Sequence, residues 1–146
     1  MSPAVAPPGA LPHMGWMPHT VSIEEIDLLA RAVLDGLPEP FRRHCREIVL
    51  QVEDFASPDQ LASVGLTERW ELSGLYEGRP VPEQSQWQSG DLPPRIWLFR
   101  MPLMVEMRST RVSLEALVRH VVVHEVGHHF GFSDAEMHAL ESAAER

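Results

Sequence analysis

The chain has 146 residues, the size of one globular domain, and 44% of them are apolar, which is enough to build a core. All 12 basic residues are arginines, and against 21 acidic residues they leave a net charge of −9. This balance argues against nucleic acid as the main partner, and no apolar run is long enough for a membrane span. The single cysteine, Cys45, excludes an internal disulfide, so we expect a cytoplasmic protein.

The N-terminal segment differs in composition from the rest. Residues 1–19 hold five prolines and no Asp, Glu, Lys or Arg. Proline or glycine interrupts every apolar stretch, which argues against a secretory signal. We therefore expect a disordered, Pro-rich arm over residues 1–19, followed by a single domain over residues 20–146.

The first half of this domain alternates helices with strands. A capping box that starts at Ser22 predicts a helix over residues 23–36, and the Ser-Pro pair at 57–58 begins a short helix. Alternating apolar residues predict one strand over about 47–54 and another over 72–76.

The second half begins with a predicted loop over residues 80–94, which contains four prolines. The clearest strand covers residues 95–100, and Pro102 either ends it or marks it as an edge strand. Ser113 then caps a long helix that ends at Gly131. A second capping box opens a terminal helix to about residue 144, and this order of elements favours a mixed fold with a small sheet.

The long helix carries the motif His124-Glu125-x-x-His128. Residues four apart share a helix face, so both imidazoles can reach one metal ion. Glu125 is turned by about 100° around the axis, where its carboxylate can contact a water on the metal and act as general base. Leu117 and Val121 precede the histidines on the same stripe, so we expect the histidines to face inward.

The pattern continues as H-E-x-x-H-x-x-G-x-x-D. A shuffled chain would hold roughly 0.04 copies of the short motif and roughly 0.0001 of the long one, so the long one is specific. Gly131 lets the chain leave the helix sharply, and Asp134 can then return to the metal as third ligand. As the first residue of a helix, Asp134 could instead serve only the helix dipole, and His138 or Glu141 would then be the third ligand.

Five further residues have weaker claims to a role. His129 points to a different face from the motif histidines, and His120 is expected to be structural. Tyr76, the only tyrosine, could act as an electrophile, but nothing in the sequence places it. We interpret Cys45 as an ordinary cysteine despite its arginine neighbours. Gly127 either permits close packing on a strand or is simply tolerated.

The stretch from Val121 to Glu136 resembles the signature of the small bacterial zincin-like metallopeptidase family, formerly a domain of unknown function. Residues 75–78 and 95–103 are similar to upstream segments of that family. The resemblance implies a minimal zincin: an α+β fold in which a small mixed sheet packs on the helix that carries H-E-x-x-H, with a short C-terminal helix.

The resemblance also implies that His124, His128 and Asp134 bind Zn²⁺ and that Glu125 is the catalytic base. We expect a monomeric, zinc-dependent metallopeptidase that hydrolyses an unidentified peptide or protein through a metal-bound water. The substrate would lie extended against an edge strand such as residues 95–100. The alternatives are a regulatory protease with one partner, and a zinc-stabilised binding or regulatory module without activity. Glu125 favours an enzyme, because a structural zinc site needs no general base.

Overall fold

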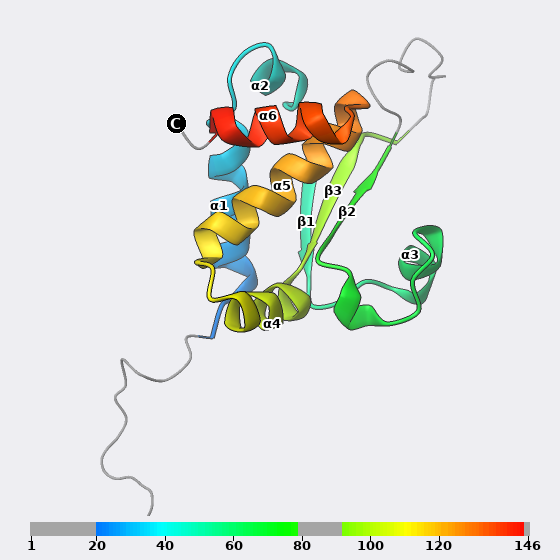
Figure 1. Ribbon diagram of the computed structural model, residues 1–146. Coiled ribbons are helices and arrows are strands. Elements are labelled where there is room, and N and C mark those ends of the chain that lie inside the picture. Colours follow the sequence, from blue (N-terminus) through cyan, green and yellow to red (C-terminus); the bar gives the residue numbers. More distant parts are fainter. Residues whose placement is uncertain (1–19, 79–91, 145–146) are drawn as a thin grey trace, which may run out of the picture.

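Within residues 20–78 and 92–144, which the computed structural model describes, the chain forms a three-stranded sheet in the order β1-β3-β2 (Figure 1). β1 (Val49–Glu53) pairs in parallel with the central strand β3 (Arg95–Phe99), and β2 (Gly74–Glu77) pairs antiparallel with it. The predicted arm and most of the predicted loop lie outside the described residues.

Two helices cover one face of this sheet. α1 (Ile23–Asp35) and α5 (Leu114–Phe130) pack against each other and against the strands, and α6 (Asp134–Ala144) lies across α5 (Figure 1). Together they bury the main apolar cluster, in which Ile96 and Val122 are fully covered. Within the described part of the chain, no helix is both long and apolar enough to cross a membrane.

A smaller apolar cluster lies on the opposite face of the sheet. It is built around α3 (Pro58–Ser63) and consists of Ala56, Leu61, Leu75 and Phe99. The 3₁₀ turn η2 (Arg69–Glu71) follows α3, and the short helix α2 (Phe41–His44) connects α1 to β1. The observed class is α+β with a mixed sheet, as the sequence predicts.

The predicted helix ends are confirmed by their hydrogen bonds. Ser22 and Glu25 form the reciprocal capping box of α1. The Ser113 hydroxyl accepts the Ala116 N–H at 3.1 Å at the start of α5. Gly131 has a φ of 69°, which places it in the left-handed region that glycine adopts without strain, and α5 ends there.

The sequence did not predict α4 (Arg100–Thr110), which begins directly after β3. Pro102 was expected to end a strand or mark an edge, but it lies in the first turn of this helix, where a missing N–H costs no hydrogen bond. The expectation that residues 95–100 form an edge strand is also wrong, because β3 is paired on both sides. The true edges are β1 and β2.

β2 and α5 approach each other closely at Gly74. A Cβ atom at this position would lie 2.5 Å from Cγ1 of Val121 and 3.6 Å from Cγ of Glu125. No real Cβ tolerates the shorter distance, and the β-branched valine has little freedom to rotate away. The absence of a side chain at Gly74 therefore sets how near the strand lies to the helix.

We expect the substitution Gly74→Ala to lower the free energy of unfolding by about 1–3 kcal/mol, because it overpacks this contact. Urea titration measures the loss. In a Val121→Ala background the obstructing methyl group is gone, so the same substitution should cost clearly less. An equal loss in both backgrounds would show that crowding against Val121 is not the cause.

Candidate metal centre

α5 presents the motif histidines as a converging pair. His124 and His128 lie one turn apart, and their Nε2 atoms are 3.3 Å from each other. Their rings are nearly perpendicular, with centroids 5.0 Å apart. Among the described residues, the only three metal-ligating side chains found with donor atoms all within 4.8 Å of one another are His124, Glu125 and His128.

The spacing of this pair fits a zinc ion. In a tetrahedral site with Zn–N bonds of 2.0–2.1 Å, two ligand atoms lie about 3.3 Å apart. The two Nε2 atoms already have this separation. Imidazole nitrogen is a preferred zinc ligand, so the donor chemistry and the geometry agree.

The two histidines do not face inward as the stripe suggested. Leu117 and Val121 on this stripe are buried, but His124 and His128 are exposed. The periodicity identifies the face correctly, yet the elements packed over α5 cover that face only as far as Val121. The expected ligands therefore lie where the buried stripe reaches the surface, a position from which a substrate could reach a metal.

Glu125 is the buried member of the motif, with 7% of its surface exposed. Burial raises its pKa to about 7, and a hydrogen bond from the backbone N–H of Tyr76 acts in the opposite direction. Tyr76 lies on β2, and within the described part of the chain the only strand that pairs with β2 is β3. The carboxylate is thus held between the histidine pair and an edge strand of the sheet.

Tyr76 also bonds to α5 through its side chain. Its hydroxyl lies 2.7 Å from Nδ1 of His129, whose Nε2 lies 3.2 Å from the carbonyl oxygen of His44. A carbonyl only accepts, so Nε2 carries the hydrogen and the Tyr76 hydroxyl donates to Nδ1. His129 is fully buried, and burial lowers its pKa. As expected, His129 does not belong to the metal-ligating group of His124, Glu125 and His128. Its hydrogen bond with Tyr76 instead joins α5 to β2.

Sequence reasoning could not place Tyr76, and it missed the contact of its backbone with Glu125. A backbone hydrogen bond leaves no trace in residue types or spacing. The one available signal was the similarity of residues 75–78 to an upstream segment of the zincin-like family.

α6 brings the two alternative ligands, His138 and Glu141, to α5, but their donor atoms do not join those of His124, Glu125 and His128. Glu141 bonds to His120, with a carboxylate oxygen 2.9 Å from Nδ1. The exposed His138 lines a hollow beside His124. His120 thus has a partner on α6, in agreement with the expected structural role.

Asp134 is the first residue of α6, where the Ser133 hydroxyl accepts the Glu136 N–H at 3.3 Å. This confirms the predicted capping box. The side chain of Asp134 lies outside what the structure describes, so its role as third ligand stays a prediction. The close approach allowed by Gly127 is to Met137 of α6, not to a strand, because a Cβ at Gly127 would lie 2.5 Å from Met137 Cγ.

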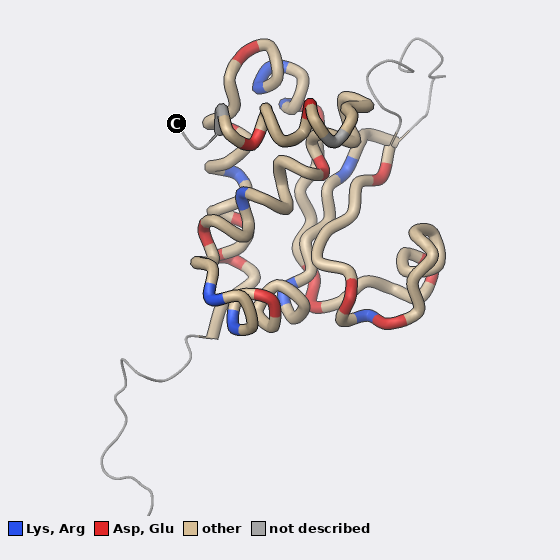
Figure 2. The backbone as a smooth tube through the Cα atoms, in the orientation of Figure 1, with Lys and Arg blue, Asp and Glu red and all other residues tan. Residues whose placement is uncertain are grey.

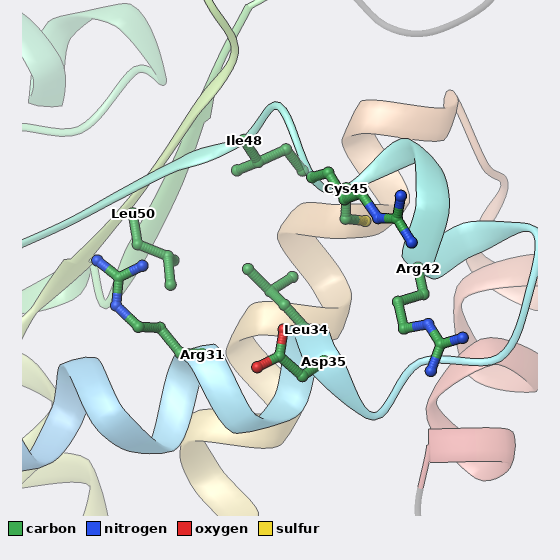
Figure 3. Close-up of a pocket in the computed structure, with 8 residues that line it drawn as sticks. Arg31, Leu34, Asp35, Arg42, Cys45, Ile48 and Leu50 are labelled. Atoms are coloured by element: carbon green, nitrogen blue, oxygen red, sulfur yellow. The ribbon is translucent and has the colours of Figure 1, made fainter.

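A separate hollow of about 460 Å³ lies between α1, α2 and β1 and holds none of the motif residues (Figure 3). Cys45 lines it, and burial raises the pKa of this thiol to about 12, which agrees with an ordinary cysteine. Arginines and acidic residues are interspersed along the described chain (Figure 2), and Arg42 of this hollow is already paired with Glu39 at 3.1 Å.

Comparison with known families agrees with this geometry. Residues 45–144 match the sequence model of the zincin-like metallopeptidase family. The match covers more than half of the chain, including the sheet and the helix with the histidine pair, and the chain therefore belongs to this family. No curated protein matches the sequence.

The buried Glu125 carboxylate predicts a pH-dependent stability in metal-free protein. Its pKa is about 7 in the folded state, against an ordinary value of 4.5. Ionisation therefore opposes folding, with a penalty that is small below pH 4.5 and complete above pH 7. Glu125→Gln removes this penalty. We expect the variant to exceed the wild type by on the order of 2–3 kcal/mol at pH 8, and by much less at pH 5.

Urea titration of chelator-treated protein at the two pH values measures this difference. Glu136→Gln is the matched control, because capping by Ser133 lowers the pKa of Glu136 and so makes its ionisation favour folding. Glu136 is ionised in both the folded and the unfolded state over nearly all of this range, so Glu136→Gln should destabilise the protein by almost the same amount at pH 5 and at pH 8. An equal effect of Glu125→Gln at both pH values would contradict the account of the buried carboxylate.

Proposed function

We propose that this protein is a zinc-dependent peptidase that cleaves extended peptide segments at the edge of β2. The observation that carries this proposal is the contact between Glu125 and the backbone of β2. It puts a general base, a pair of zinc-binding imidazoles and a strand edge beside one another. Peptide hydrolysis at a zinc site needs these three parts together.

His124 and His128 would hold the zinc ion through their Nε2 atoms, with Asp134 as the third protein ligand. Three protein ligands leave one position open, as in catalytic rather than structural zinc sites. Zinc bound there would polarise the scissile carbonyl and lower the pKa of a water ligand to about 7.

Glu125 would supply the proton transfers. Its carboxylate has a pKa of about 7, which suits a group that takes a proton from an attacking water and gives it to the leaving amine. Its donor atom lies within 4.8 Å of those of the histidine pair. A purely structural zinc site would gain nothing from burying such a group, and this favours an enzyme over a zinc-stabilised binding module.

β2, not β3, would receive the substrate. β3 is paired on both sides, whereas among the described residues β2 pairs only with β3, and the backbone N–H of Tyr76 that contacts Glu125 belongs to β2. An extended peptide can add to such an edge through backbone hydrogen bonds, which bind many sequences. We also propose that the substrate is a peptide or protein, that the enzyme is a monomer, and that it acts in the cytoplasm.

Removal of single groups should separate metal binding from hydrolysis. His124→Ala and His128→Ala should each lose zinc, because either leaves one imidazole of the pair. Glu125→Gln should keep zinc but lower the rate of hydrolysis by about 10²–10⁴-fold, since an amide cannot accept the proton. Elemental analysis and digestion of a peptide library measure the two effects.

The control is Glu71→Gln, which changes an exposed carboxylate of η2. It should leave the zinc content and the rate of hydrolysis unchanged. Hydrolysis by Glu125→Gln at the wild-type rate would reject the general base. A wild-type protein that binds zinc and cleaves nothing in the library would favour the binding module instead.

Asp134 is tested by two substitutions. If it is the third ligand, both Asp134→Ala and Asp134→Asn should weaken zinc binding by orders of magnitude, because both remove the negative charge. If it serves only the helix dipole, each should cost about 0.3–1 kcal/mol of stability and leave zinc affinity within a few-fold of the wild type. Titration against a chelator distinguishes the two results.

A further inference from the structure

The face of α5 that carries the histidine pair lies between two neighbouring elements. β2 packs on the side of Glu125, where a Cβ atom at Gly74 would lie 3.6 Å from Cγ of Glu125. α6 packs on the side of Gly127, against which Met137 lies. At about 100° per residue, Glu125 and Gly127 are on nearly opposite sides of the helix axis, and His124 is between them. The exposed histidines therefore have β2 on one side and α6 on the other.

α6 carries an exposed imidazole on the side that faces these histidines. His138 and Glu141 are three residues apart and share a face of α6. The carboxylate of Glu141 lies 2.9 Å from Nδ1 of His120, one turn before His124 on α5, so this contact turns the shared face toward the histidine pair. His138 and His124 line the same hollow of about 200 Å³ between the two helices. His138 thus lies beside an expected zinc ligand.

Peptide hydrolysis also needs a hydrogen-bond donor that the site has not yet supplied. When water adds to the scissile carbon, its proton passes to Glu125, and the π electrons of the carbonyl bond become a negative charge on the oxygen. A positioned N–H or O–H group stabilises this charge in the transition state. The sequence suggested Tyr76, but its hydroxyl donates to Nδ1 of His129 and its backbone N–H donates to Glu125. Both donors of Tyr76 are therefore in use within the fold.

We propose that His138 is a catalytic residue of the peptidase and donates a hydrogen bond from its ring to the scissile carbonyl oxygen as negative charge develops there. This assignment rests on the proposed function. A peptide added to the edge of β2 would lie over the exposed face of α5, with α6 on its other side. His138 is not among the converging donors His124, Glu125 and His128. No hydrogen bond or ion pair with another described residue occupies its ring, so the ring N–H can donate to a substrate.

The test is steady-state kinetics of the full, zinc-loaded chain on the peptide that the wild type cleaves best in the library. His138→Ala should lower kcat by about 10²–10³-fold and leave KM within a few-fold, because the hydrogen bond strengthens only as the charge develops. Zinc affinity in a chelator titration should stay within a few-fold of the wild type. His138→Gln should recover part of the lost rate, since its amide N–H can also donate.

A second readout needs no turnover. In the phosphinic analogue of the same peptide, a tetrahedral phosphorus with a charged oxygen replaces the scissile carbonyl and resembles the transition state. Calorimetry should show that this analogue binds the zinc-loaded His138→Ala variant about 10²-fold more weakly than the wild type. Equal binding to both proteins would overturn the assignment of His138.

His120→Ala is the matched control, because it removes another exposed imidazole from the same hollow and also breaks the contact with Glu141. It should leave kcat within a few-fold. A loss as large as that of His138→Ala would show that the position of α6 is the cause and would overturn the assignment. An unchanged kcat in His138→Ala, or loss of its zinc, would overturn it as well. A wild-type chain that binds zinc and cleaves nothing would instead contradict the proposed function, and the role of His138 would fall with it.

Discussion

The contact between β2 and α5 determines the rest of this site. Gly74 lets the strand approach Val121, and at this distance the backbone N–H of Tyr76 reaches the carboxylate of Glu125. The Tyr76 hydroxyl joins the same two elements a second time through His129. Packing and hydrogen bonds therefore hold the edge strand and the carboxylate beside the histidine pair.

Burial of the Glu125 carboxylate is unfavourable, and a purely structural zinc site would not require it. Burial desolvates the carboxylate of Glu125, which is why its pKa rises to about 7. His124 and His128, by contrast, are exposed although they follow an apolar stripe. Functional groups with such perturbed properties cluster at catalytic sites, and this combination agrees with membership of a metallopeptidase family.

Features set by local rules were predictable from the sequence, and features set by distant partners were not. The caps at Ser22 and Ser133, and the long helix with its motif, follow from spacing and residue type. Pro102 was misleading because the same residue ends a strand or sits in the first turn of a helix. Strand order, the identity of the edge strands and the point where the cover over α5 ends depend on contacts between segments far apart in the sequence.

X-ray absorption at the zinc edge, on the full chain loaded with one equivalent of zinc, tests the central claim most directly. The account predicts two imidazole nitrogens at about 2.0–2.1 Å and only oxygen atoms at the remaining positions. In His124→Ala the imidazole signal should fall, or zinc should be lost. A tight ion with three or four imidazole ligands, or a spectrum unchanged in His124→Ala, would contradict the account.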